Sequence, residues 1–161
     1  MKVANVVLND FTRDNRVLKV STALLESGHD VTVVGLHRNN LPRKEEHRAG
    51  FQVERVRIYI PGFRFLTPFK WAELALRIAI KYRKYDAWHC NDAEAFAMGL
   101  LAKWMRPGLK LIYDCHEFES ERNGKPGWLS RGVRKMETRY IRKAEEVIVV
   151  SPSIQAAYES R

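Results

Sequence analysis

The sequence predicts a doubly wound α/β domain built on a mainly parallel, Rossmann-like sheet, and three observations support this fold class. Short apolar segments alternate with longer amphipathic segments along all 161 residues, a pattern typical of strands joined by helices. The stretch Val3–Leu36 has the length and the pattern of one βαβ unit. Polar side chains directly follow two successive apolar segments, at His89–Asp92 and at Asp114–Glu117. In open parallel sheets, ligands bind at such corners, where a strand passes into a helix.

Six apolar segments are predicted to be the strands of this sheet. Most are short and mainly apolar, which indicates strands that are buried on both faces. The third alternates apolar and polar residues and is expected near an edge of the sheet. Numbered along the chain, the strands are expected to lie in the order 3-2-1-4-5-6. Their predicted ranges are Val3–Leu8, Val31–Leu36, Gln52–Ile58, Ala87–Trp88, Leu109–Tyr113 and Val147–Val150.

Helices are predicted between these strands from apolar periodicity and from start and stop signals. The first ends at Gly28, and the second runs from the cap residue Thr67 to about Lys84. The segments 37–50 and 61–68 are polar or contain proline, and they are expected to be loops. The remaining predicted helices are Ala93–Trp104, a strongly basic one at Trp128–Ala144, and one that begins at Ser151.

Composition and charge limit the functions that the chain can have. Of its residues, 45% are hydrophobic and 29% are charged, which is ordinary for a soluble globular protein. No apolar run has the ~20 residues of a membrane span, and the N-terminus lacks a signal-peptide pattern, so a cytoplasmic protein is expected. The two cysteines, Cys90 and Cys115, are too few for a disulfide scaffold. The net charge of +9 suits nucleic acid, an anionic membrane surface or phosphorylated substrates.

Several common catalytic motifs are absent from the sequence. Neither a Gly-x-Gly-x-x-Gly loop nor a Gly-x-x-x-x-Gly-Lys loop follows the first strand, which argues against a dehydrogenase and a P-loop enzyme. A Gly-x-Ser-x-Gly elbow is also missing, which argues against a hydrolase triad. The pairs His89–Cys90 and Cys115–His116 suggest zinc, but adjacent strand residues point to opposite faces, so each pair offers at most one inward ligand. We therefore expect neither a metal nor a cofactor.

The candidate catalytic residues are His89, Asn91 and Asp92, at the end of the fourth predicted strand. Their position at the carboxyl end of a strand favours a role in ligand binding. A structural role is the alternative, because Asp92 could cap the following helix and His89 could be satisfied by backbone groups. At least one polar residue of the next corner is expected to face the same cleft. These candidates for substrate binding are Asp114, His116 and Glu117.

Three charged residues near the first strand are further candidates for substrate binding. Arg13, Asp14 and Arg16 stand where the first strand meets its helix. An arginine at this point could hold a phosphate group, helped by the N-terminus of the helix. The alternative is a solvated loop in which these residues only cap the helix.

The excess of positive charge has two candidate locations. Phe63, Arg64 and Phe65 lie in a predicted loop, and this mixture of aromatic and basic residues is typical of a contact with a membrane surface. The basic helix carries Arg131 to Lys143 with few balancing acids, which favours a polyanionic partner. The alternative for that helix is a solvated face without a partner.

Four segments of the chain resemble a known protein family. Residues 13–34, which begin Arg-Asp-Asn-Arg-Val-Leu, resemble the first βαβ unit of family 4 glycosyltransferases of the GT-B fold. The same holds for Tyr-Asp-Ala-Trp-His-Cys-Asn-Asp at 85–92, Tyr-Asp-Cys-His-Glu at 113–117 and the stretch 142–151. The four segments occur in the order of the family and cover nearly the whole chain.

This resemblance implies an architecture and an activity. In the family, two Rossmann-like domains enclose a cleft; the N-terminal domain mostly binds the acceptor, and the C-terminal domain mostly binds the nucleotide-sugar donor. Residues 1–161 resemble only the first of these, and we expect the donor-binding domain to be absent from this chain. The implied reaction is hexosyl transfer with retention, from a nucleotide sugar to a glycan or lipid-linked acceptor, without a metal. We expect the fragment alone to be inactive, and the enzyme to be cytoplasmic with a peripheral contact to the inner face of the membrane.

The sequence departs from the family at the fourth corner. The family commonly has His-x-His-Asp there, whereas this chain has His89-Cys90-Asn91-Asp92. Asn91 stands where the second histidine is usual, and asparagine can hydrogen-bond but cannot titrate near neutral pH. His89, Asn91 and Asp92 are expected to orient the acceptor and the sugar. The alternative from another class is a non-catalytic basic α/β domain that binds an anionic membrane surface or nucleic acid; nucleic acid is not expected as a partner of the enzyme.

Overall fold

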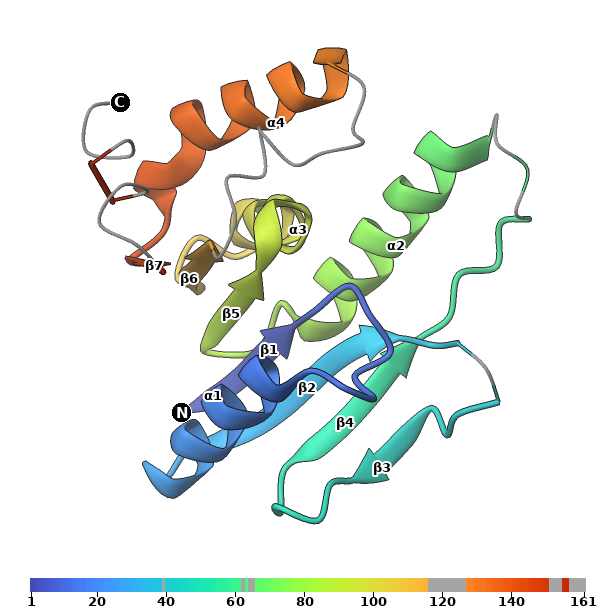
Figure 1. The fold of residues 1–161 in the computed structure, drawn as a ribbon, viewed down its shortest axis with the longest axis vertical. Helices are drawn as coiled ribbons and strands as arrows, with labels where there is room; N and C mark the ends of the chain where they lie inside the picture. The colour runs from blue at the N-terminus through green and yellow to red at the C-terminus, as the bar shows by residue number, and fades with distance from the viewer. Residues whose placement is uncertain (39, 62, 64–65, 116–126, 151–154, 157–161) are drawn as a thin grey trace.

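A seven-stranded sheet forms the centre of the protein in a computed structural model that describes residues 1–38, 40–61, 63, 66–115, 127–150 and 155–156 (Figure 1). The strands lie in the order β3-β4-β2-β1-β5-β6-β7, and β3 is antiparallel to its neighbour β4 while the other pairs are parallel. The strands are β1 (Lys2–Val6), β2 (Asp30–Leu36), β3 (Lys44–Glu46), β4 (Gln52–Val56), β5 (Ala87–Asn91), β6 (Lys110–Cys115) and β7 (Glu146–Val149).

Helices cover the two faces of the sheet unequally. On one face, α1 packs on β2 and β4, while α2, α3 and α4 lie on the other face (Figure 1). This division follows from right-handed crossovers, since the chain moves in opposite directions from β1 to β2 and from β5 to β6. The helices are α1 (Asn15–Glu26), α2 (Thr67–Tyr82), α3 (Asp92–Met105) and α4 (Gly127–Tyr140), and a short 3-10 helix follows at Ile141–Lys143.

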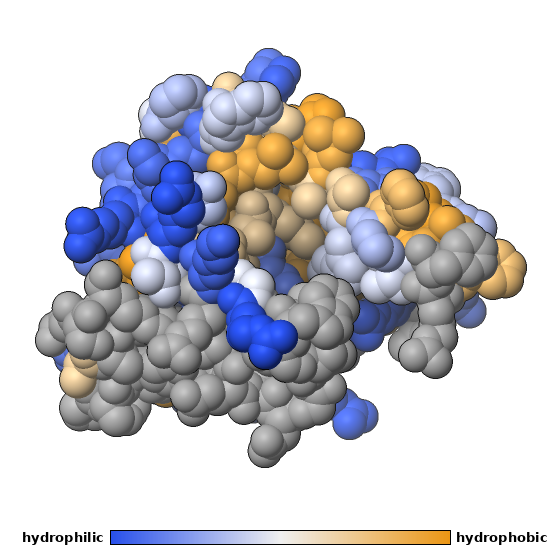
Figure 2. Space-filling view, turned by 90° about the horizontal axis from the view of Figure 1, so that it is seen from above, coloured by the Kyte–Doolittle hydropathy of each residue, from blue (hydrophilic) through white to orange (hydrophobic). Residues whose placement is uncertain are grey.

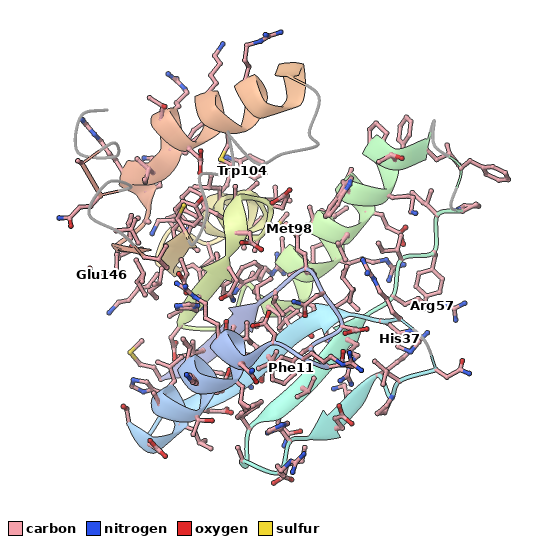
Figure 3. All side chains as sticks on the ribbon, viewed as in Figure 1. Phe11, His37, Arg57, Met98, Trp104 and Glu146 are labelled. Atoms are coloured by element: carbon pink, nitrogen blue, oxygen red, sulfur yellow. The ribbon has the colours of Figure 1, made fainter. Side chains whose placement is uncertain are left out.

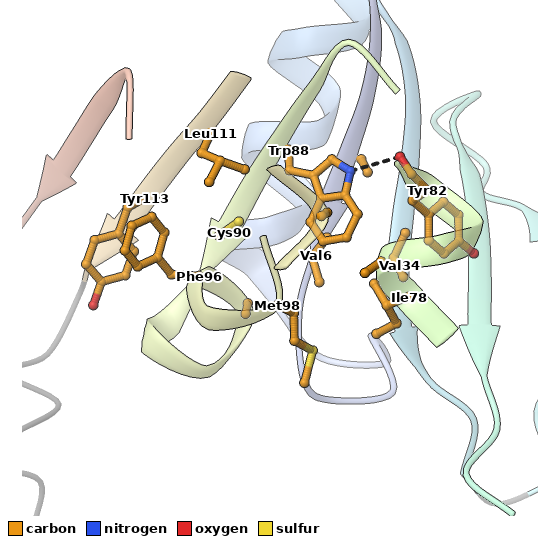
Figure 4. Packing of buried hydrophobic residues seen from close by; sticks show 14 of the residues in the cluster. Val6, Val34, Ile78, Tyr82, Trp88, Cys90, Phe96, Met98, Leu111 and Tyr113 are labelled. Carbon is orange, nitrogen blue, oxygen red and sulfur yellow. Dashed lines mark hydrogen bonds between the residues drawn. The ribbon is translucent and has the colours of Figure 1, made fainter. Parts of the chain in front are cut away.

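The larger apolar core lies between the sheet and the helices α2 and α3. Trp88 is fully buried there, and its indole Nε1 donates a hydrogen bond to the backbone oxygen of Tyr82 at 3.0 Å (Figure 4). Phe96 of α3 stacks on Tyr113 of β6, with 4.6 Å between the ring centroids. Each large apolar side chain buried in this way contributes about 1.5–3 kcal/mol to folding. This core therefore holds the sheet and its helices together.

Close contact between α3 and the sheet depends on Gly99. A Cβ atom at this position would lie 2.9 Å from Cys90 Sγ and 3.1 Å from a methyl carbon of Leu111. Burial in the same contact raises the pKa of the Cys90 thiol. Both cysteines, Cys90 and Cys115, are buried in the larger core and pack there with apolar side chains.

The predicted fold class is confirmed, and the prediction lacked one strand. The six predicted strands are all present, and their predicted order 3-2-1-4-5-6 corresponds to β4-β2-β1-β5-β6-β7. The segment 37–50 was expected to be an exposed loop, but β3 forms within it and pairs with β4. β3 has the sequence Lys-Glu-Glu and is exposed, so apolar periodicity carried no signal of it.

Buried Arg55 on β4 explains why β3 forms at this edge. Its Nη2 lies 2.7 Å from Glu45 Oε1, and its Nη1 and Nε donate to the backbone oxygens of Pro42 and Asp10 at 2.9 and 2.8 Å. A buried guanidinium requires such partners, and here they come from the loop after β1 and from the edge segment. The arginine therefore fixes the edge segment beside β4.

Several element boundaries also differ from the prediction. Strand β5 continues through His89 to Asn91, so the polar corner begins inside the strand. The predicted basic helix 128–144 is α4, but it ends at Tyr140 and the 3-10 helix follows. Most of the helix predicted to begin at Ser151 lies outside the described residues.

Candidate functional site

A cluster of buried polar side chains lies on the α1 face of the sheet, toward the carboxyl ends of β1, β5 and β6. The register pairs Asn5 with His89 and Asn91 with Asp114, so the four side chains lie on the same face. Each of them is at most 4% exposed. Because burial of unpaired polar groups is unfavourable, the bonds within this cluster decide what it can do.

Asn91 is held in place by hydrogen bonds to β1. Its Nδ2 donates to Asn5 Oδ1 at 2.7 Å and to the backbone oxygen of Val6 at 2.9 Å. Asn5 Nδ2 donates in turn to Ser21 Oγ of α1 at 2.9 Å. Asn91 Oδ1 has no hydrogen-bond partner within the described ranges. The side chain is therefore fixed in orientation and retains an acceptor for another group.

The sequence analysis did not identify Asn5 and Ser21 as part of this network. One signal was available, because Asn5 interrupts an otherwise apolar run from Val3 to Leu8. A polar residue inside a strand buried on both faces requires a partner. Ser21 carried no such signal, since a serine within an amphipathic helix is ordinary.

Arg16 and Asp114 form an ion pair on the same face. Arg16 Nε donates to Asp114 Oδ2 at 2.9 Å, and Arg16 Nη2 contacts Asp114 Oδ1. His89 Nε2 lies 3.8 Å from Asp114 Oδ2, which is too long for a hydrogen bond but close enough for a direct electrostatic interaction. The structure thus brings together three of the predicted site residues, Arg16, His89 and Asp114.

Asp14 caps helix α1, which is the role that the sequence analysis gave as the alternative to substrate binding. It is the N-cap residue, and its side chain accepts hydrogen bonds from the backbone N–H of Val17 at 3.1 Å and from Asn9 Nδ2 at 2.8 Å. Arg13 is exposed beside it. A role of Arg13 and Asp14 in substrate binding remains a prediction.

Asp92 does not cap α3 in the expected way. It is the first residue of the helix, and the N-cap position belongs to Asn91, whose side chain makes no capping hydrogen bond. Asp92 has a φ of +75°, which is uncommon for a residue other than glycine, although aspartate tolerates it better than most. Such backbone conformations are unfavourable and occur preferentially at functional sites.

Two of the predicted site residues cannot be placed. His116 and Glu117 lie outside the described residues, so their roles remain predictions. Within the part of the chain that the structure describes, no three His, Cys, Asp or Glu side chains are grouped so that they could hold a metal ion.

A groove runs along the α1 face next to the polar cluster. Its volume is about 560 Å³, and its walls come from β1, α1, β5, β6 and β7. His89 lines it together with apolar side chains such as Val20, Leu24, Ile112 and Ile148. His89 therefore lies at the border between the polar cluster and an apolar groove.

Comparison with solved structures relates this fold to parts of larger proteins. The chain is similar to sucrose-phosphate synthase from Thermosynechococcus elongatus, with a TM-score of 0.76 and 16% identity, over 99% of this chain and 45% of that one. It is similar to Anabaena Alr3699/HepE, solved with UDP and glucose, with a TM-score of 0.67 and 17% identity, over 99% and 41% of the two chains. MurG from Acinetobacter baumannii gives a TM-score of 0.57 and 15% identity, over 94% and 41%.

At these identities the comparison establishes the fold, and the chain spans less than half the length of each of these proteins. No relative was found among curated proteins. Residues 14–161 match the family described as Glycosyltransferase Family 4. This range contains both polar corners, His89–Asp92 and Asp114–Glu117. The match covers most of the chain. The chain therefore belongs to Glycosyltransferase Family 4 and has the fold of the N-terminal domain of a GT-B glycosyltransferase.

Proposed function

We propose that this chain is the acceptor-side domain of a retaining glycosyltransferase, which moves a sugar from a nucleotide sugar to a glycan or lipid-linked acceptor. The observation that carries the proposal is the buried polar cluster at the carboxyl ends of β1, β5 and β6, in a chain that belongs to a glycosyltransferase family. Ligands of open α/β sheets bind at this edge. The UDP and glucose in the structure of the Anabaena protein support a nucleotide sugar as the donor class.

Each residue of the corner has a proposed role. Asn91 offers its buried Oδ1 to a sugar hydroxyl, and the hydrogen bonds of its Nδ2 hold that acceptor in place. His89 supplies an imidazole, the side chain whose charge changes most readily near neutral pH. Asp92 begins α3 at the same corner, where its carboxylate can orient an acceptor hydroxyl. No metal or other cofactor takes part in this proposal.

The short length of the chain leads to a proposal about activity. The donor is expected to bind mostly to a second domain, and the chain spans less than half of its structural neighbours. We propose that the 161-residue chain transfers no sugar alone. The test compares this chain with a longer protein that includes the second domain, using a panel of labelled nucleotide sugars. Transfer by the short chain well above a buffer blank would contradict the proposal.

We also propose a peripheral contact with the inner face of an anionic membrane, and its best-supported location is α2. On the outer side of this helix, Phe69, Leu76 and Ile80 are 62%, 47% and 50% exposed at helical spacing, and Phe63 is exposed nearby. An exposed apolar stripe on a helix is unusual in a protein without a partner. Seen from above, hydrophilic side chains gather over α4, and hydrophobic ones lie between α4 and α2 and over the end of α2 (Figure 2).

Basic side chains flank this stripe. A hollow of about 440 Å³ beside α2 is lined by Ile80 and by six basic residues: Arg43, Lys44, Arg55, Arg57, Arg77 and Lys81. Arg57 lies at the outer end of this region, on the opposite side of the molecule from Glu146 (Figure 3). Apolar and basic residues together are typical of a helix that lies in a membrane interface. The predicted contacts Arg64 and Phe65 lie outside the described residues. Among the helices that the structure describes, none is long and apolar enough to cross a membrane.

Vesicle sedimentation tests this contact. Binding is expected with anionic vesicles, and it should weaken with added salt because each basic residue near the surface contributes about 1 kcal/mol. The double variant Leu76→Gln/Ile80→Gln should bind roughly tenfold less, since two apolar side chains no longer enter the interface. Trp104→Gln is the matched control, because Trp104 is 80% exposed on α3. Equal binding to neutral vesicles would contradict the proposal, and strong binding to DNA alone would favour a basic nucleic-acid-binding domain.

A further inference from the structure

The Arg16–Asp114 pair connects two elements that are far apart in the sheet. Helix α1 packs its apolar side chains on β2 and β4, whereas Asp114 belongs to β6. Strands β1 and β5 lie between β2 and β6 in the strand order. The Arg16 side chain therefore crosses the polar end of the sheet, and its partner is 98 residues away in the sequence.

This geometry changes the role expected for Arg16. Two nitrogens of one guanidinium contact both oxygens of one carboxylate, which is the strongest arrangement that this side chain can make. Asp114 is only 1% exposed, so its negative charge is poorly solvated and the arginine stabilises it. An arginine committed to a buried carboxylate is poorly placed to serve as a phosphate clamp.

His89 is close enough to respond to this pair. Its Nε2 lies 3.8 Å from Asp114 Oδ2, and both side chains are almost fully buried. A bare carboxylate at this distance favours the protonated imidazolium, whereas a carboxylate neutralised by arginine exerts a much weaker pull. The arginine therefore decides how strongly Asp114 acts on His89.

Other groups around His89 come from each neighbouring element. Asn5 is its partner on β1 and does not titrate. Glu146 of β7 and His29 after α1 line the same groove, and Glu146 is exposed, so water screens its charge. Among the described residues, Asp114 is the buried anion next to the imidazole.

We propose that Arg16 is a positioning residue, which holds Asp114 in place and neutralises its charge so that His89 remains a neutral imidazole at neutral pH. A neutral imidazole can accept a hydrogen bond from a sugar hydroxyl, which the imidazolium cannot do. This inference rests on the proposed function in one respect: it assumes that His89 contacts the substrate.

The titration of His89 by NMR, without any sugar present, tests the electrostatic part directly. Arg16→Gln should raise the midpoint of the His89 titration by ~1 pH unit, because the carboxylate is no longer neutralised. Asp114→Asn should lower the midpoint, because the arginine remains without its anion. The double variant should return close to the wild type. Lys19→Gln, which removes an exposed positive charge from the same helix, should leave the midpoint unchanged.

Opposite shifts in the two single variants are the signature of the proposal. If Arg16→Gln does not fold, Asp114→Asn decides alone, and an unchanged midpoint in a folded variant would overturn the inference. Because no substrate is present, this result does not depend on whether the protein transfers sugar.

Kinetics of the longer enzyme separate positioning from substrate binding. Arg16→Gln should lower kcat at neutral pH about threefold, because a midpoint raised by ~1 pH unit leaves a smaller neutral fraction of His89. It should also move the pH optimum upward, while KM for the nucleotide sugar changes less than about twofold. Arg16→Lys keeps the charge but loses the two-point contact, so it should restore part of kcat. A raised KM with an unchanged His89 titration would show that Arg16 binds substrate, as the sequence had suggested.

Discussion

The two faces of strand β5 are built for different purposes. Trp88 and Cys90 point toward α2 and α3 and pack in the larger apolar core, whereas His89 and Asn91 point to the α1 face and contact polar groups. Adjacent residues of one strand thus enter two environments, because side chains alternate between faces. Stability comes mainly from the first face, and the chemistry of the proposed site is confined to the second.

The unequal cover of the sheet explains this difference. Three helices close the face of Trp88, while on the other face α1 packs over β2 and β4. The α1 face of β5 to β7 borders a groove instead. Polar side chains remain there because they contact one another, as Asn91 does with Asn5 and Arg16 with Asp114. Of this cluster, His89 also lines the groove.

The largest expected effect is on stability, and it comes from replacing Trp88 on the apolar face of β5. Trp88→Ala should lower the free energy of unfolding by ~3–5 kcal/mol, because a fully buried aromatic side chain is replaced by a cavity. Urea unfolding followed by circular dichroism measures this change. Trp104→Ala is the control, since Trp104 is exposed and its loss should cost less than about 0.5 kcal/mol. Equal effects of the two variants would refute the assignment of the core to this face.

The opposite face should respond in activity rather than in stability. Asn91→Ala removes the positioned amide of the corner, so transfer by the longer enzyme should fall about 100-fold, equivalent to ~2.7 kcal/mol. The free energy of unfolding should fall by only ~1–3 kcal/mol, from the lost hydrogen bonds to Asn5 and Val6. Melting temperature and transfer rate should be measured side by side. Near-normal turnover would move the proposed site to Asp114, His116 and Glu117.

Glu54 is a charged exception on the α2 face and makes stability depend on pH. Burial alone would raise its pKa, but hydrogen bonds from Lys44, Lys81 and Tyr82 lower the pKa to about 2. The ionised carboxylate therefore stabilises the fold above pH 4.5, and this contribution should be lost as the pH falls from 4.5 to 2. We expect a loss of about 1–2 kcal/mol, because the two lysines are largely in water.

Unfolding at several acid pH values measures this dependence. The Glu54→Gln variant keeps the shape of the side chain but has no carboxylate to protonate. It should therefore lack the part of the stability loss between pH 4.5 and 2 that comes from Glu54. An identical pH dependence in wild type and variant would count against a paired carboxylate at this edge.

The smallest expected effect concerns the contact between α1 and the polar cluster. Ser21→Ala removes the hydroxyl that accepts from Asn5 Nδ2, so the free energy of unfolding should fall by ~1 kcal/mol. Thermal unfolding is sufficient to detect this change. A variant as stable as the wild type would indicate that α1 is held by its apolar contacts alone.

Local pattern was sufficient to predict six of the seven described strands, the order of those six, and the helices between them. Apolar runs and cap residues act over a few positions, and right-handed crossovers then leave few ways to arrange alternating strands and helices. The position of His89 and Asn91 at a carboxyl end also followed from this pattern, as did Asp114 on the neighbouring strand. The sequence therefore predicted a candidate site at the carboxyl ends of the strands, and its role in catalysis stays a prediction.

Tertiary structure decided which of these side chains meet. Strand β3 has no apolar residue and exists because β4 and Arg55 provide its partners. The pairing of Arg16 with Asp114 joins residues 98 positions apart, and Ser21 reaches Asn5 only when α1 lies on the sheet. Sequence spacing carries no information about such contacts, because a buried polar group needs a partner but does not specify which one. The folded sheet supplies that choice by fixing the distances between strands and helices.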